Sequence, residues 1–298
     1  MAGDGWTRVT ARDPCKCCQG TSWCQYSETN IMCMRVASDH PARGDGGGWI
    51  HKRDDALSTP AIPLKPKKPR LTDYELAAVW GPRAKQWWLN SGAKTDELAA
   101  ILGVESWALA ELKVGWDGSA WTHPELNHQG LIVGITRRFK DGIKVCCPGS
   151  RRGLTYSETW NVAGSTVLLV EGLSDTAAGL TMGLCVIGRP SNIGGVEMLA
   201  RLLRHFDRKI IVIGERDSKP ERRKEHGHKP GVWCGACFPG LVGCQQTANK
   251  LQERLHRRVG WRMLPDGAKD LRAWYTDQGH GEGFTAGQRL LKALERTR

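Results

Sequence analysis

The sequence predicts an α/β fold whose C-terminal half is built on a mainly parallel sheet. The first observation is Val167–Asp175, where an apolar run ends in Glu171 and leads into a segment of helical character. The second is Lys209–Asp217, a later apolar run that also ends in acidic residues. The third is the alternation of strand and helix between them, which is typical of parallel sheets. A cysteine-rich segment and a basic α+β segment precede this half.

Composition narrows the class of protein and its partner. The 298 residues suffice for two or three small domains, and the formal net charge of +12 favours a polyanionic partner, most commonly nucleic acid. No signal peptide or long apolar stretch is present, so we expect a cytoplasmic protein with no membrane contact. Its 11 cysteines, unevenly distributed, indicate metal ligands and buried thiols more than a disulfide framework.

Residues 1–57 contain a cysteine pattern typical of a zinc ribbon. Cys15 and Cys18 form a C-x2-C turn that presents two thiolates from one tight knuckle, and Cys33 follows on a predicted hairpin. So short a segment cannot otherwise bury enough surface to fold, and bound Zn²⁺ is expected to organise it. The alternative is a set of buried thiols without metal.

The fourth zinc ligand remains open at this point. The hairpin is expected to pair Trp23–Ser27 with Ile31–Met34, and Cys24 lies on its first strand. His51, in the GGGWIHKR stretch beyond the hairpin, is the alternative ligand. Cys17 lies inside the knuckle and is expected not to bind the metal.

Residues 58–70 are rich in proline and lysine and predict an extended linker, either a plain spacer or one that also touches phosphate. Residues 71–160 predict a helical and basic subdomain. Its candidate helices are Tyr74–Trp80, Arg83–Trp88, Thr95–Leu102 and Ser106–Leu112.

The last two of these helices, joined by a turn at Gly103, also have the pattern of a DNA-binding helix-turn-helix. The second helix offers almost no basic or amide side chains for base edges, so a structural helix pair is favoured.

A hairpin is predicted where Leu131–Phe139 and Ile143–Cys147 flank Asp141-Gly142. Alternate residues of a strand share a side, so cations here predict a surface for template or nucleotide phosphates, with a solvated face as the alternative. The cations of this region are Arg137, Arg138, Lys140, Lys144, Arg151 and Arg152. The adjacent Cys146 and Cys147 are expected to pack in the fold.

The C-terminal half, residues 161–298, alternates strands with helices. The expected helices are Thr176–Met182, Val196–His205 and Thr247–Arg258, with short strands at Leu184–Ile187 and Val259–Met263 and a last helix opened by Asp270. Parallel strands bring their carboxyl ends to one edge, so the acids that follow them should lie together. These acids are Glu171, Asp175, Glu215, Asp217 and Asp270.

Each acid has an ordinary alternative. Asp175 and Asp270 are also suited to cap helices, and Asp217 to form a turn. Several carboxylates at one edge would repel one another unless a cation offsets the charge, which favours a site for Mg²⁺ or Mn²⁺.

An insertion at residues 218–246 carries further candidate zinc ligands in a basic loop. They are Cys234, Cys237, Cys244, His226 and His228. Their order is unusual for a zinc site, and the alternative is that the cations of this loop contact nucleic acid.

The motifs VLLVEGLSD, GRPSN, IVIGERD and GAKDLRAW resemble the Toprim domain of bacterial and phage DNA primases, which topoisomerases and some nucleases share. The zinc ribbon and LIVGITRRFKDGIKVCCPGSRRGL are similar to the rest of the primase arrangement. The resemblance implies that Glu171 and Asp175 match the first acids of the family, Glu215 and Asp217 its D-x-D pair, and Asp270 its later aspartate. One departure is Glu215, which replaces an aspartate and places its carboxylate one methylene farther out.

The resemblance implies synthesis of RNA primers on a single-stranded DNA template from ribonucleoside triphosphates. Glu171, Glu215 and Asp217 would hold Mg²⁺, and Arg137, Arg138, Lys144, Arg151 and Arg152 would position phosphates. A replicative helicase would be supplied in trans. The alternatives are a non-catalytic zinc and Toprim protein that binds nucleic acid, and a Toprim nuclease.

Overall fold

The computed structural model describes residues 5–42, 48–53, 70–162, 164–217, 234–235, 237–278 and 283–296. It forms two compact units, Met1–Arg70 and Leu71–Arg298. No helix among the described residues is both long and apolar enough to span a membrane.

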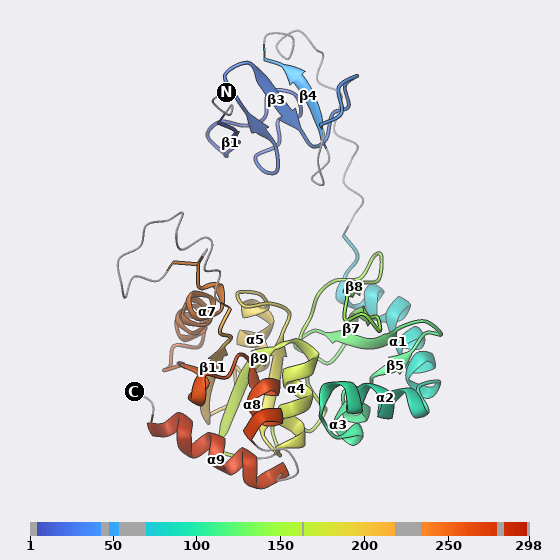
Figure 1. Ribbon diagram of the computed structural model, residues 1–298, viewed down its shortest axis with the longest axis vertical. Coiled ribbons are helices and arrows are strands. Elements are labelled where there is room, and N and C mark those ends of the chain that lie inside the picture. The colour runs from blue at the N-terminus through green and yellow to red at the C-terminus, as the bar shows by residue number, and fades with distance from the viewer. Residues whose placement is uncertain are drawn as a thin grey trace. The chain divides into compact units, whose positions relative to one another are not determined.

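The N-terminal unit is a small antiparallel sheet of four strands in the order β1-β2-β3-β4 (Figure 1). The strands are β1 (Thr7–Arg8), β2 (Gln25–Tyr26), β3 (Asn30–Cys33) and β4 (Trp49–Lys52). The expected hairpin is present, because Tyr26 pairs with Ile31 across β2 and β3. Among the described residues, its buried apolar core apart from cysteines consists of Val9 and Ile31. Such a core is too small to stabilise a fold alone.

The C-terminal unit begins with three helices and an antiparallel sheet in the order β5-β6-β7-β8. The helices are α1 (Asp73–Leu89), α2 (Ala93–Leu102) and α3 (Ser106–Glu111), and the strands are β5 (Gly115–Trp116), β6 (Trp121–Leu126), β7 (Ile132–Arg138) and β8 (Lys144–Cys146). β7 and β8 form the predicted hairpin.

The expectation of two helices within residues 74–88 is wrong, because α1 is continuous through Pro82. Thr72 and Glu75 form a capping box at its start. The buried side chains Leu76 and Trp80 lie before the proline, and packing in one cluster with β7 holds the helix together across it.

The structural interpretation of α2 and α3 is supported by what covers them. Leu109 of α3 is fully buried in a core shared with a later helix, α4 (Gly172–Thr181). The backbone N–H of Glu105, at the start of α3, donates to Thr181 of α4 at 3.2 Å. A helix buried in this way is not a free recognition helix.

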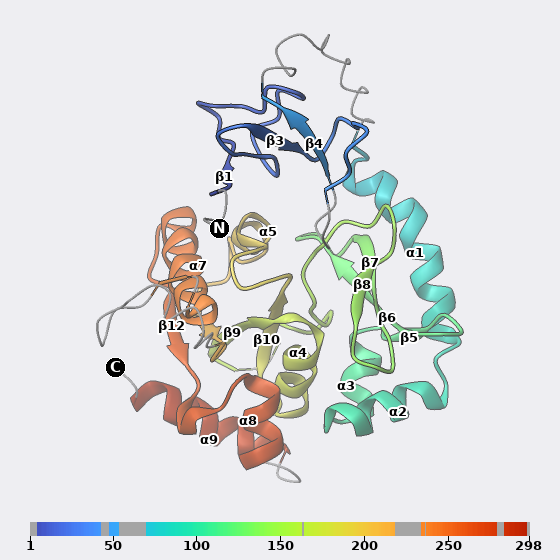
Figure 2. The same ribbon diagram turned by 45° about the horizontal axis from the view of Figure 1, so that its top comes forward.

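The second sheet is parallel throughout, as predicted, in the order β10-β9-β11-β12. Its strands are β9 (Thr166–Glu171), β10 (Cys185–Arg189), β11 (Lys209–Gly214) and β12 (Gly260–Met263). The remaining helices are α5 (Val196–Leu202), α7 (Pro239–Leu255), α8 (Leu271–Gln278) and α9 (Gly283–Arg296). Helices α4, α8 and α9 pack in the core on one face of this sheet and α5 and α7 in the core on the other (Figure 2).

Two helices begin earlier than predicted. α4 begins at Gly172, so Asp175 lies inside its first turn and does not precede the helix. α7 begins at Pro239, where Gly240 meets the backbone of Glu215 so closely that a Cβ would clash with it. Tertiary packing at a glycine therefore adds turns to the start of α7.

One segment joins the two sheets. Leu154 forms a bridge to Leu126 at the end of β6, and the next residue, Thr155, forms a bridge to Gly188 of β10. This connection brings the cationic β7–β8 hairpin opposite the carboxyl edge of the parallel sheet.

Candidate functional site

Four cysteines of the N-terminal unit form a cluster of metal-ligand geometry. The sulfur atoms of Cys15, Cys18, Cys24 and Cys33 all lie within 4.8 Å of one another, and all four side chains are buried. His51 is not part of the cluster, because its Nε2 lies 3.0 Å from the carbonyl oxygen of Val36. The open choice of fourth ligand is thus resolved in favour of Cys24.

Backbone and side-chain donors surround these sulfur atoms. The N–H groups of Met34 and Val36 donate to Cys24 and Cys33 at 3.4 and 3.3 Å. The hydrogen bond between Cys33 and Cys15 lowers the pKa of Cys15 and raises that of Cys33, whereas the backbone N–H groups lower the pKa of the cysteines that they contact. Donors of this kind favour thiolates, the form in which cysteine binds zinc.

Cys17 is not one of the clustered cysteines, as expected. Burial and the neighbouring Cys15 raise its pKa to about 12. Burial raises the pKa of Cys24 as well, so it is the position of Cys17 outside the cluster that separates it from the ligands.

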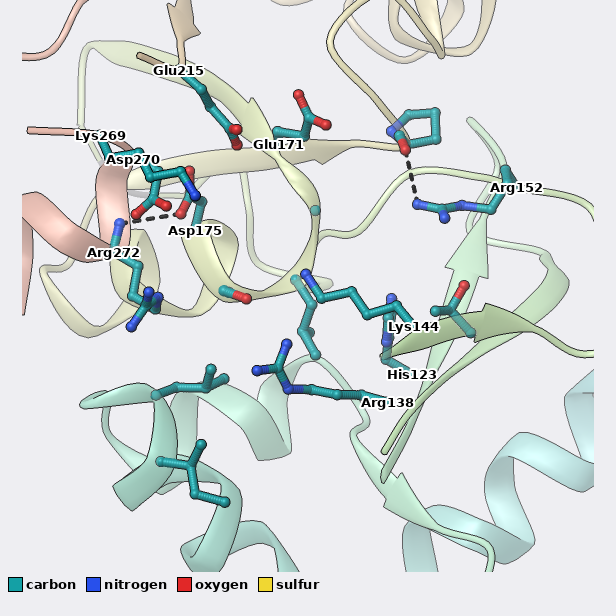
Figure 3. A pocket seen from close by; sticks show the side chains of 17 residues that line it. His123, Arg138, Lys144, Arg152, Glu171, Asp175, Glu215, Lys269, Asp270 and Arg272 are labelled. Atoms are coloured by element: carbon teal, nitrogen blue, oxygen red, sulfur yellow. Dashed lines mark hydrogen bonds between the residues drawn. The ribbon is translucent and has the colours of Figure 1, made fainter. Parts of the chain in front are cut away.

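A cleft of about 590 Å³ lies between the parallel sheet and the β7–β8 hairpin (Figure 3). Acidic groups from the parallel half and cations from the hairpin half face one another across it. The ionisable residues that line it are His123, Arg138, Lys144, Arg152, Glu171, Asp175, Glu215, Lys269, Asp270 and Arg272.

The strand order places the acids. Glu171 ends the central strand β9, and Glu215 follows the neighbouring strand β11. Burial and then the charge of Glu171 raise the pKa of Glu215 to about 8. Burial also raises the pKa of Glu171. Buried carboxyl groups that are held close together in spite of their mutual repulsion are a common feature of functional sites.

Asp175 and Asp270 both contact the start of α8. The Asp175 carboxylate accepts the backbone N–H groups of Leu271 and Arg272 at 3.2 and 3.1 Å. Asp270 accepts the N–H of Ala273 at 2.7 Å, as an N-cap does. The capping alternative therefore holds for Asp270. Asp175 does not cap its own helix, because it lies inside α4 and accepts N–H groups at the start of α8. Both aspartates also line the cleft.

Asp217 does not line this cleft. It borders a second hollow, also of about 590 Å³, in which Glu215 and Trp261 take part. Its charge nevertheless contributes to the raised pKa of Glu171 and of Glu215, so it belongs electrostatically to the same group.

Three of the five predicted phosphate-binding cations line the cleft, namely Arg138, Lys144 and Arg152. Arg138 and Lys144 are direct partners across β7 and β8, and both side chains extend toward the acids (Figure 3). Burial is the first cause that lowers the pKa of both groups. The second cause is a nearby cation, which is Arg138 for Lys144 and Arg272 for Arg138. A bound anion would offset this repulsion.

The other two predicted cations are bound elsewhere, which corrects the expectation of a common face. Arg137 is adjacent to Arg138 and so points to the opposite side of β7, where its Nε lies 2.6 Å from Asp117. Arg151 pairs with Asp73 at the start of α1. Lys140, a further cation of this region that was not among those five, pairs with Glu97 at 3.1 Å.

Arg152 is held in the cleft by Glu125, a residue that sequence reasoning missed. The fully buried Glu125 carboxylate lies 3.0 Å from Nε of Arg152 and accepts the N–H of Gly153 at 2.7 Å. It also accepts the hydroxyl of Thr136. A polar residue in the middle of an otherwise buried strand was the available signal.

Arg189 and His123 were also missed. Arg189, at the end of β10, is 1% exposed and donates to the carbonyl oxygens of Val170 at 3.3 Å and Ile213 at 2.9 Å. It thereby joins the strand ends that carry Glu171 and Glu215, which the GRPSN motif did not reveal. His123 lines the cleft with a buried, unpartnered Nδ1, and burial lowers its pKa to about 3, so it is neutral.

The candidate second zinc site is only partly described. His226 and His228 lie outside the described residues. Cys244 lies in α7, where its buried thiol packs in the core and donates to the carbonyl of Leu241 at 3.0 Å. Of the adjacent pair in the hairpin, Cys147 is buried in the core beside α1, as expected.

The protein thus has an α/β fold in which acids at the carboxyl edge of a parallel sheet face cations of a hairpin across one cleft. Such a site has the chemistry to bind phosphate esters together with a metal ion. No family model matches the sequence, and no curated protein matches it. Solved primases are similar in structure. The DnaG primase catalytic domain bound to single-stranded DNA is 13% identical, with a TM-score of 0.54 over 73% of this chain and 78% of that one.

Two further solved primase structures are similar to this chain to the same extent. The zinc-binding and RNA polymerase domains of the Aquifex aeolicus primase are 14% identical, with a TM-score of 0.53 over 77% of this chain and 63% of that one. A DNA primase domain from Pseudomonas aeruginosa is 14% identical, with a TM-score of 0.52 over 74% and 78%. The fold is therefore that of the DnaG-type primase core.

Proposed function

We propose that this protein is a DNA primase that synthesises short RNA primers on single-stranded DNA by metal-dependent nucleotidyl transfer. The observation that carries the proposal is the cleft in which Glu171 and Glu215 face Arg138 and Lys144. Fold similarity to primases supports the same conclusion.

The reaction joins a nucleotide to the 3′-hydroxyl of a growing RNA. The hydroxyl oxygen attacks the α-phosphate of a ribonucleoside triphosphate, and pyrophosphate leaves. Arg138, Lys144 and Arg152 would hold the triphosphate, since Arg and Lys bind phosphate through charge-assisted hydrogen bonds. Arg138 is partly buried, whereas Lys144 and Arg152 are exposed and so remain accessible to a triphosphate that enters the cleft.

Glu171, Glu215 and Asp217 are the residues that would hold Mg²⁺ or Mn²⁺. Their oxygen donors fit these ions, although among the described residues only the four cysteines already form a group as close as a metal site. Mg²⁺ needs only one or two carboxylates, with water and phosphate completing its shell. When bound, the ion would lower the pKa of the hydroxyl and offset charge on the leaving pyrophosphate.

The N-terminal unit would bind Zn²⁺ through Cys15, Cys18, Cys24 and Cys33 and would contact the template strand. Four thiolates in a closed shell are typical of structural zinc, which stabilises a fold and leaves no position open for chemistry. We therefore assign this unit to DNA binding and the cleft to catalysis.

The test is to incubate the protein with single-stranded DNA, labelled ribonucleoside triphosphates and Mg²⁺. Short RNA products that disappear in Glu171→Gln are expected. DNA binding without products would favour a non-catalytic binding protein, and a shortened template would favour a nuclease. Either result would refute the proposal.

A further inference from the structure

The second hollow lies beside the acid group but has a different lining from the cleft. Glu215 borders both, so the two spaces meet at this side chain. Apart from the acids, the second hollow is lined by Arg216 and Gln245 and by four apolar side chains, Phe238, Leu241, Trp261 and Met263. Its volume of about 590 Å³ falls within the range of small-molecule sites, about 300–1,000 Å³.

Two elements place the apolar side chains beside the acids. Trp261 and Met263 are two residues apart on β12, so their side chains lie on the same side of the sheet. This is the side on which α7 packs. The close contact of Gly240 with the backbone of Glu215 brings the start of α7 against the end of β11. Phe238 and Leu241, on either side of that contact, are thus held beside Glu215.

Trp261 is poorly explained as a core residue. Its side chain is 36% exposed on an edge strand, and it borders the hollow. Gln245, one helical turn after Leu241, adds an amide that can both donate and accept hydrogen bonds. An exposed indole with a nearby amide provides a stacking surface and a polar group for the edge of a planar heterocycle.

We propose that this hollow, which we call the aromatic hollow, binds the base of the nucleoside triphosphate whose phosphates lie on Arg138 and Lys144. This occupant is inferred because the cleft and the aromatic hollow share Glu215. The cations of the cleft lie on one side of the acids, and the aromatic side chains of the hollow lie on the other. A nucleotide has the same order of chemistry, with charged phosphates, a ribose and an apolar ring. The inference rests on the proposed function, which assigns the triphosphate to Arg138 and Lys144.

The experiment compares ATP with inorganic tripolyphosphate as calorimetric probes of the intact protein in Mg²⁺ buffer. Trp261→Ala should weaken ATP binding about 5- to 100-fold, the range measured for loss of base stacking, and leave tripolyphosphate binding unchanged. Trp261→Phe keeps a ring and should restore most of the affinity. Unchanged tripolyphosphate binding also shows that the variant is folded.

Trp107→Ala is the matched control, since Trp107 is 45% exposed on α3 and lines neither space. Equal ATP affinity in Trp261→Ala and Trp107→Ala would overturn the inference. So would weaker binding of single-stranded DNA by Trp261→Ala with ATP binding unchanged, because the hollow would then serve the template.

Lys144→Ala separates this inference from the proposed function. It should weaken ATP and tripolyphosphate equally, because it removes a phosphate contact. If Lys144→Ala changes the affinity for neither ATP nor tripolyphosphate, the assignment of the phosphates to Lys144 is wrong. A loss of affinity for ATP alone in Trp261→Ala would still place a base in the aromatic hollow.

Discussion

The carboxylate of Asp175 in α4 accepts the backbone N–H of Leu271, the first residue of α8, at 3.2 Å. A buried acid thus holds together two helices that lie far apart in the sequence. The same carboxylate lines the cleft, so the shape of the cleft on this side depends on a group that also titrates.

Stability should depend on pH through Asp175. Burial and then the charge of Asp270 raise the pKa of Asp175 from 3.8 to about 7. A raised carboxyl pKa means that the folded state disfavours ionisation, so the free energy of unfolding should fall as pH rises from about 4 to 7 and level off above.

Asp175→Asn should remove this part of the slope, as measured by urea unfolding between pH 4.5 and 8 in buffer without Mg²⁺. An unchanged slope would show that Asp175 is not the titrating group.

Zinc should be bound by the four clustered cysteines and by no neighbour. Cys33→Ser should lose the metal and unfold the N-terminal unit, because its small core cannot support it. Cys17→Ser is the control and should retain zinc, since Cys17 lies outside the cluster. Elemental analysis of both variants checks this, and a folded wild-type unit without zinc would contradict it.

Adjacent arginines should have different roles. Arg138→Ala should reduce primer synthesis about 10- to 100-fold, because a charge-assisted phosphate contact of about 1.5–3 kcal/mol is lost. Arg137→Ala should leave the rate near that of wild type and lower the free energy of unfolding by about 1 kcal/mol through its pair with Asp117. Steady-state rates and urea unfolding of the two variants test this. Equal loss of activity in both would contradict the assignment of opposite faces.

Glu125 should contribute to stability through its buried hydrogen bonds. Glu125→Ala removes the acceptor for Arg152, Thr136 and Gly153 and should lower the free energy of unfolding by about 2–3 kcal/mol. Glu158→Ala is the control, because that side chain is 85% exposed and 3.9 Å from Lys113, and it should change little. Similar midpoints for both variants in urea would refute this role.

Mg²⁺ binding should tighten with pH. The pKa of Glu215 is raised to about 8 by burial and by Glu171, so below pH 8 the ion must displace a proton. The apparent Kd for Mg²⁺ should fall by up to about tenfold per pH unit between pH 6 and 8 and then level off. Calorimetric titration measures this, and Glu215→Gln should reduce the dependence and leave the part that comes from Glu171, whose pKa is also raised. A Kd independent of pH in the wild type would exclude Glu215 as a ligand.

Local sequence patterns were sufficient to predict much of the fold. Apolar runs that end in acids predicted the parallel sheet, and turn chemistry at Asp141-Gly142 predicted the β7–β8 hairpin, because both depend on neighbouring residues. The C-x2-C knuckle and Cys33 predicted three members of the cluster for the same reason, whereas the choice between Cys24 and His51 required the structure. Pro82 misled the prediction of α1, since packing against β7 outweighs the lost hydrogen bond.

By itself the sequence determined which residue types were available at each strand end. Only the tertiary structure decided which of them meet. Arg137 and Arg138 are neighbours in sequence, yet the period of a strand sends them to opposite faces. Glu125 and Arg152, or Asp175 and Leu271, meet only after the chain has folded, because contacts between distant residues depend on the packing of whole elements, which no local pattern encodes.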